Sequence, residues 1–500
     1  MIEIQGYNSK EEFINELPTQ IASVFNIRYN VKERLEGILN RFIDNIFIIV
    51  EYPYVDKYYR DTYYNFFSKK HTVHQRDSVR VSFFYNNIQV GDFVNGEKIK
   101  DIQKAFLGIL TIRPTSFSII GHTFLSPKIL KDNSFVCCLC KERVSIGGIE
   151  MSLYGFPFCS QDNESITCAE SVLLMMADYY SNKFSDYSRL LPSEINETLK
   201  NLSAERQLPS TGLDTGDISF VLKDLGLGTK IYEKNVNDKG LFKQILYIYI
   251  ESGIPVILVL DNNQGKRHVV VAIGREKVKN NVMANKKFTK EKQAHFSDIF
   301  DKILVMNDNC TPFELVDYES PCNYDTTYKI SSFIVPLYNK VYSDAPLFLD
   351  HFKAIIDEFS KEENAAKVLY SKDQQLITRY FLTTSRSYKN YVVASKEFTP
   401  EFKAIFVDQS MPKFIWVAEI IKGTRLEEEN QKVNTVVILD ATESGFSGNL
   451  IIAFNSKNIV LTKFSDGKKL YSVVEMNIGN FNTFNNNLKG NHTLWQSQNY

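Results

Sequence analysis

The sequence lacks the features of a secreted, membrane-spanning or strongly charged protein. Its first residues, MIEIQGYNSKEEF, have no basic segment followed by an apolar run, which argues against a secretory signal. The longest apolar runs, FIDNIFIIVEY and IPVILVL, are too short to cross a bilayer. Because 58 Lys and Arg residues nearly balance 59 Asp and Glu residues, no overall electric field attracts nucleic acid. We therefore expect a cytoplasmic protein with no membrane span and no nucleic-acid partner.

Disulfides, zinc sites and phosphate loops are also not indicated. Seven cysteines, an odd number spread over a long chain, are typical of free thiols in a reducing compartment. Cys137 and Cys140 form a CxxC pair, but no second ligand pair follows at the spacing of a zinc ribbon, so a buried strand is the simpler interpretation. Glycine-rich phosphate loops are absent. We expect no metal and no cofactor.

The length and texture of the chain predict a protein of α+β class with several parts. Five hundred residues exceed one hydrophobic core. We predict an N-terminal α/β region over residues 1–130, a central domain over 131–345, and a C-terminal region over 346–500 in which a helix precedes β-rich sequence. Helical spacing of apolar residues extends over 10–49, and alternating or apolar runs predict strands from about residue 78 onward.

The stretch FCSQDNESITCAESVLLMMADYY, residues 158–180, carries the first candidate for chemistry. A polar, turn-like segment leads to Cys168, and helical periodicity starts immediately after it. A cysteine acts as a nucleophile in its thiolate form, and a helix N-terminus favours that anion. A lone cysteine at such a place is more often a small buried residue. Its partners elsewhere in the sequence decide between the two interpretations.

Three further groups complete a nucleophilic site in chain order. Gln161 lies on the loop that enters the helix, from where its amide could bind an oxyanion. His268 lies near the start of the predicted strand RHVVVAIG and is the candidate base. The next strand ends in the sequence LVMNDN, in which Asn307, Asp308 or Asn309 could orient the imidazole.

These motifs together resemble papain-like cysteine peptidases, most of all the group that processes double-glycine bacteriocin leaders and its soluble, uncharacterised bacterial relatives. The likeness rests on QDNESITCAESVLLMMADYY, GLDTGDISFVLKDLG, ESGIPVILVLDNNQGKRHVVVAIG and ILVMNDNCTPFEL. It implies a papain-like domain, with a helical part carrying the cysteine and an antiparallel sheet carrying the histidine. It also implies a triad of Cys168, His268 and Asp308 with Gln161 in the oxyanion hole, and Asn307 is the alternative third member. Ala169 replaces the usual glycine after the cysteine, and a charged insertion separates His268 from Asp308.

The predicted function is that of a cysteine-dependent hydrolase, a peptidase that cleaves an amide or isopeptide bond of a protein or peptide through a thioester. Gly212, Leu213 and Asp214, after the cysteine helix, are candidates for a wall of the substrate groove. Two alternatives stay open: a transglutaminase-like acyl transferase with the same site, and a catalytically silent papain-like binding module. The flanking regions could serve a protein partner.

Overall fold

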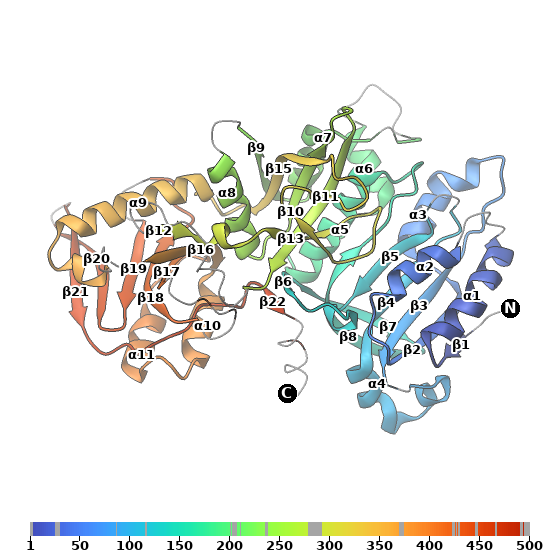
Figure 1. Ribbon diagram of the computed structural model, residues 1–500, viewed down its shortest axis with the longest axis horizontal. Coiled ribbons are helices and arrows are strands. Elements are labelled where there is room, and N and C mark those ends of the chain that lie inside the picture. Colours follow the sequence, from blue (N-terminus) through green and yellow to red (C-terminus); the bar gives the residue numbers. More distant parts are fainter. Residues whose placement is uncertain are drawn as a thin grey trace.

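The computed structural model describes residues 4–25, 31–86, 88–115, 118–200, 202, 208–210, 212–235, 239–278, 293–369, 375–422, 426, 428, 431–445, 449–465, 468–490 and 494. The described strands form three β-sheets, and helices pack against each sheet (Figure 1). The chain is therefore of α+β class, as the sequence predicts. No helix in the described ranges is long and apolar enough to cross a membrane.

The first sheet has the order β1-β2-β3-β4-β5-β8-β7 and is antiparallel throughout. Its core strands are rich in isoleucine, valine and phenylalanine, which suit a buried pleated surface. Gly147 and Gly148, both with positive φ, close the β7-β8 hairpin. The strands are β1 (Ile4–Tyr7), β2 (Ile46–Tyr54), β3 (Ser78–Tyr85), β4 (Phe106–Ile112), β5 (Ile120–Leu125), β7 (Cys140–Ile146) and β8 (Ile149–Phe158).

The central sheet has the order β14-β13-β11-β10-β15-β9, and its interior strands β10 and β11 are almost entirely buried. Helix α5 packs between this sheet and the first one, with contacts to β8 and β11. The strands are β6 (Phe135–Cys137), β9 (Leu227–Glu233), β10 (Val256–Asp261), β11 (Arg267–Glu276), β13 (Lys302–Met306), β14 (Glu314–Asp317) and β15 (Lys329–Tyr338).

The third sheet has the order β12-β16-β17-β18-β19-β20-β21. Helix α9 lies over one face, whereas α10 and α11 lie over the other (Figure 1). The face under α10 and α11 has its own aromatic core, including Phe402, Phe454 and Phe481. The strands are β12 (Gln293–His295), β16 (Leu376–Thr384), β17 (Phe414–Lys422), β18 (Val433–Asp440), β19 (Leu450–Asn455), β20 (Asn458–Ser465) and β21 (Lys468–Glu475).

The helices fill the spaces between and around the sheets. Helix α5 begins at Cys168, as the sequence predicts, and α8 lies between the central and third sheets, in contact with β11 and β16. The helices are α1 (Lys10–Phe25), α2 (Val31–Leu39), α3 (Lys57–Asn65), α4 (Ile99–Ala105), α5 (Cys168–Lys183), α6 (Pro192–Leu199), α7 (Thr215–Asp224), α8 (Lys239–Glu251), α9 (Ala345–Lys361), α10 (Ser385–Ala394) and α11 (Pro400–Asp408).

Several strands pair with strands that lie on the other side of a predicted domain boundary. β12 lies within the predicted central domain but pairs with β16 of the third sheet. Near the C-terminus, β22 (Lys489–Gly490) returns to pair with β6 beside the central sheet. The first sheet likewise takes β5 from before residue 130 and β7 and β8 from after it. The two predicted boundaries stay predictions, and the sheets are joined to one another through these exchanged strands.

A buried ionic network joins the central and third sheets. Glu251, the last residue of α8, accepts hydrogen bonds from Arg275 on β11 and, at 2.6 Å, from Arg379 on β16. Arg379 also contacts Glu419 on β17 at 3.1 Å. All four side chains are at most 5% exposed. Arg275 also pairs with Glu428 at 2.8 Å. The two arginines lower the pKa of Glu251, whereas burial raises the pKa of Glu419 to about 7.

A second buried cluster joins the first sheet to α5. His122 Nε2 on β5 lies 3.0 Å from Asp178 on α5, and the hydroxyl of Tyr58 on α3 donates to the same carboxylate. Contact with this carboxylate raises the pKa of His122, and the imidazole lowers the pKa of Asp178. The helix that carries Cys168 is therefore anchored to the N-terminal region by charge as well as by packing.

The structure corrects one sequence prediction, and another falls on residues that it does not describe. Residues 46–54 form strand β2 instead of continuing a helix, because the run IFIIV is β-branched and buried on both faces of a sheet. Cys137 and Cys140 are buried in β6 and β7, as predicted. The described ranges hold no cluster of ligands suited to a metal ion. Most of the charged insertion after His268, residues 279–292, lies outside the described residues.

Candidate active site

The loop before Cys168 is shaped by its own polar side chains. Asp162 Oδ1 accepts hydrogen bonds from three successive backbone N–H groups, those of residues 164–166, at 2.7 to 2.9 Å. Glu170 accepts from the backbone N–H of Thr167 at 3.1 Å and also from its hydroxyl, which forms a capping box. These bonds define where the helix begins, and they place Cys168 as its first residue.

Cys168 is half-buried at this helix start, next to the central sheet. The backbone N–H of Val269 on β11 points to its thiol and favours the thiolate. Burial has the larger effect and, with the nearby Asp308 carboxylate, raises the pKa of Cys168 to about 12. The structure therefore holds a neutral thiol at rest, which needs a base before it can react.

His268 is buried on β11, next to Val269, and its ring is oriented by Asn307. The distance from His268 Nε2 to Asn307 Oδ1 is 3.0 Å. Asn307 Oδ1 also accepts the backbone N–H of Asn309 at 3.1 Å, so this oxygen faces the ring as an acceptor. The ring proton is then on Nε2, and Nδ1 is left as the basic nitrogen. Within the described residues no hydrogen bond joins the ring to Cys168.

Asp308 lies beside the same ring but makes a longer contact. Its Oδ1 is 3.5 Å from His268 Nε2, compared with 3.0 Å for Asn307. Burial raises the pKa of Asp308 to about 7, and nearby backbone N–H groups offset part of this effect. Beyond these backbone N–H groups and His268, the described chain gives the Asp308 carboxylate no partner, and Asn307 Nδ2 has none. Such unpartnered buried polar atoms are rare and are often found where a site performs chemistry.

The side chain of Gln161 contacts the loop that follows β13. Its side-chain amide donates to Asn309 Oδ1, and Asn309 Nδ2 in turn lies 3.2 Å from the hydroxyl of Tyr324. A primary amide has two N–H donors, so one donor of Gln161 is left for an oxyanion. The centroid of the Tyr324 ring is 6.3 Å from that of His268, and this tyrosine is 52% exposed. Tyr324 therefore marks the open side of the site.

Two arginines of the N-terminal region hold the loop that carries these groups. Arg34 on α2 donates to the backbone carbonyls of Asn309 and Cys310, both at 3.0 Å. Arg41, just after α2, donates to the carbonyls of Pro312, at 2.8 Å, and Phe313. Sequence reasoning missed both arginines, because nothing in the local sequence around them indicates a distant partner.

The predicted groove residues lie near the start of α5. Asp214 caps α7 by accepting the N–H of Asp217 at 2.8 Å, and Gly212 has a φ of +95°, which a residue with a side chain rarely adopts. Ser210, two residues earlier, donates to Glu170 in the first turn of α5. This contact places the segment next to the helix that carries Cys168. Whether residues 212–214 contact substrate stays a prediction.

Removal of Arg34 or Arg41 is expected to make the loop of residues 307–313 more mobile. Arg34→Ala and Arg41→Ala each remove two hydrogen bonds from a charged donor to backbone carbonyls, and such bonds contribute about 1.5 to 3 kcal/mol each. We expect the amides of residues 307–313 to exchange hydrogen faster in both variants, with little change in β16–β18. Arg76→Ala, which removes an ion pair with Asp77 in which the arginine is 62% exposed, is the control. Unchanged exchange at 307–313 would contradict this expectation.

The buried carboxyl of Asp308 predicts a pH-dependent stability. Its folded pKa of about 7 exceeds the value of about 3.9 in an unfolded chain, so folding favours the neutral form. The stabilisation of that form is fully present below about pH 4 and is lost as the pH rises through 7, a change on the order of 4 kcal/mol. Asp308→Asn should therefore stabilise the protein at pH 8 much more than at pH 4.5, as measured by urea unfolding. An equal effect at both pH values would refute this explanation.

Comparison with protein-family models and with curated protein sequences finds no match for this chain. The likeness to papain-like peptidases therefore depends on the motif residues and on their positions alone.

Proposed function

We propose that this protein is a cysteine-dependent hydrolase of papain-like type that cleaves an amide or isopeptide bond in a peptide or protein. The observation that carries the proposal is the orientation of His268. Asn307 Oδ1 accepts a hydrogen bond from Nε2–H, which leaves Nδ1 as the base, while the neighbouring Val269 N–H points to Cys168. Residues separated by a hundred or more positions in the sequence thus lie around the N-terminus of α5.

The resting site is a thiol beside a neutral imidazole, because burial raises the pKa of Cys168 and lowers the pKa of His268. His268 Nδ1 removes the thiol proton as Sγ attacks the carbonyl carbon. The second N–H of Gln161 and the backbone N–H of Cys168 donate to the oxyanion. The imidazolium then protonates the leaving amine, which leaves a thioester on Cys168. Water, deprotonated by His268, hydrolyses the thioester and restores the thiol.

The third member of the triad is Asn307 in this proposal, with Asp308 beside it. Asn307 makes the shorter contact with the ring and fixes its tautomer. Asp308 instead places a second ionisable group within reach of both His268 and Cys168. Its negative charge would disfavour the thiolate, so protonation of Asp308 favours the reactive form of Cys168.

Incubation of the purified chain with a pool of peptides, followed by mass spectrometry of the products, tests the proposal. We expect internal cleavage by the wild type and none by Cys168→Ala, with equal thermal unfolding of the two proteins. Addition of a primary amine separates hydrolysis from acyl transfer, since a transferase would give products extended by the amine. Cleavage that persists in Cys168→Ala would refute the proposal, as would complete absence of products from the wild type.

A further inference from the structure

A hollow of about 580 Å³ lies on the N-terminal region, between α4, the β7-β8 hairpin and the short turn Pro127–Ile129. This volume is within the range of pockets for small molecules. Part of its lining is apolar, contributed by Phe106, Met151 and Leu153. Polar residues surround this part, so the hollow has the composition of a site for a ligand with an apolar and a charged end.

Positive charge gathers around this hollow, although the chain as a whole has a net charge of −1. Among the described residues, the charged side chains that line it are five cations and one carboxylate, namely Lys100, Lys104, Lys128, Lys141, Arg143 and Glu150. The carboxylate of Glu150 is 4.0 Å from Arg143, and both are at least 70% exposed. An exposed pair of this kind is weak.

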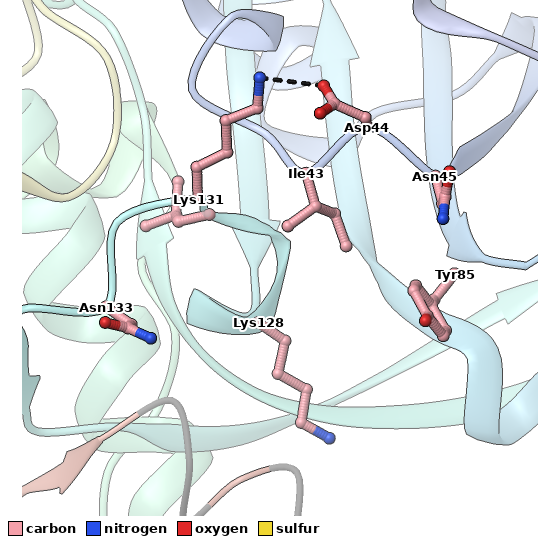
Figure 2. A pocket seen from close by; sticks show the side chains of 8 residues that line it. Ile43, Asp44, Asn45, Tyr85, Lys128, Lys131 and Asn133 are labelled. Carbon is pink, nitrogen blue, oxygen red and sulfur yellow. Dashed lines mark ion pairs between the residues drawn. The ribbon is translucent and has the colours of Figure 1, made fainter.

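Lys128 lies between two hollows and lines both of them. It lines the first one and also a second of about 630 Å³, which contains Asp44 and Lys131. Figure 2 shows that Lys131 is paired with Asp44, at 2.9 Å, whereas the ammonium of Lys128 points away from this pair. Lys128 is only 5% exposed, and burial lowers the pKa of its ammonium to about 8. An anion in the hollow would favour its charged form.

We propose that the hollow lined by α4, β7 and Lys128 binds a small polyanion that carries phosphate or carboxylate groups. Lys100 and Lys104 from the helix and Lys141 and Arg143 from the strand surround the anionic end. The apolar floor accommodates a hydrophobic or planar body. This site is separate from Cys168 in the fold, and it does not depend on the proposed hydrolase activity.

Isothermal titration of the full chain with inorganic triphosphate, ATP and citrate tests the proposal. We expect saturable binding of at least one probe with a Kd below about 1 mM, weakened by added salt. The order of affinities identifies the ligand: triphosphate above citrate indicates phosphate, citrate above triphosphate indicates carboxylate, and ATP above triphosphate indicates that the apolar floor contributes.

A matched pair of charge reversals gives the decisive control. Lys141 and Arg143 are exposed on β7, so Lys141→Glu/Arg143→Glu should fold normally and weaken binding at least about tenfold. Lys353→Glu/Arg386→Glu changes the net charge equally at exposed positions of α9 and α10, and its affinity should stay within about twofold of the wild type. Failure of all three probes to bind, or equal weakening in both variants, would overturn the proposal.

Discussion

Replacement of Asn307 by alanine is expected to lower the rate of peptide cleavage by about 10²- to 10⁴-fold. The loss of an orienting group leaves an imidazole free to adopt the wrong tautomer, and comparable changes in other triads have effects of this size. In this protein Asn307 Oδ1 accepts a hydrogen bond from Nε2–H of His268 and is itself held in place by the N–H of Asn309. The measurement is kcat/KM on a peptide found to be cleaved by the wild type.

The same measurement on Asp308→Asn distinguishes the two neighbours. We expect a smaller loss at neutral pH, because Asp308 lies 3.5 Å from the ring and not within a short hydrogen bond. Since the ionised carboxylate disfavours the Cys168 thiolate, Asp308→Asn should also flatten the decline of activity as the pH rises through 7. A larger loss in Asp308→Asn than in Asn307→Ala would show that Asp308 is the triad member.

Glu251→Gln is expected to destabilise the protein by about 3 to 5 kcal/mol, the usual result when one charge of a buried ionic network is removed. Arg275 and Arg379 both depend on this carboxylate, and each is at most 5% exposed. Arg275 keeps Glu428 and Arg379 keeps Glu419 as partners, but loss of Glu251 removes the one carboxylate that contacts both arginines at the junction of the central and third sheets. The measurement is the shift in urea or thermal unfolding relative to the wild type.

Glu36→Gln is the matched control for this substitution. Glu36 pairs with Lys32 at 3.8 Å on the exposed surface of α2, and an exposed pair contributes no more than about 1 kcal/mol. A destabilisation by Glu251→Gln that is no greater than that by Glu36→Gln would mean that the network does not hold the two sheets together.

Local signals in the sequence predicted the parts of the site that depend on one helix or one strand. The polar run before Cys168 and the periodicity after it predicted where α5 begins, since helix starts are determined by nearby caps. The apolar run after His268 predicted β11 in the same way. The strands of the third sheet, such as Phe414–Lys422 and Val433–Asp440, were also predictable from runs of valine and isoleucine.

The remaining parts depend on contacts between distant residues, which one sequence does not reveal. Asn307 and Asp308 follow the same strand, and only the position of His268 across the sheet shows which side chain makes the shorter contact. Arg34 and Arg41 lie some 270 residues from the carbonyls they hold. The helical spacing over 10–49 failed at Ile46–Tyr54 because the burial of both faces in a sheet overrode it.

The N-terminal region therefore contacts both the loop and the helix that form the candidate site. It supplies the arginines that hold the loop after Asn307, and its His122 pairs with Asp178 on the helix that carries Cys168.

The most direct test of the central claim is the reactivity of Cys168 toward iodoacetamide at neutral pH, followed by mass spectrometry for each cysteine. The proposed site predicts that Cys168 is alkylated faster than Cys310 and Cys322, and that His268→Ala removes this difference, because His268 takes the thiol proton. Labelling of Cys168 no faster than Cys310 or Cys322, and unchanged in His268→Ala, would contradict a catalytic cysteine.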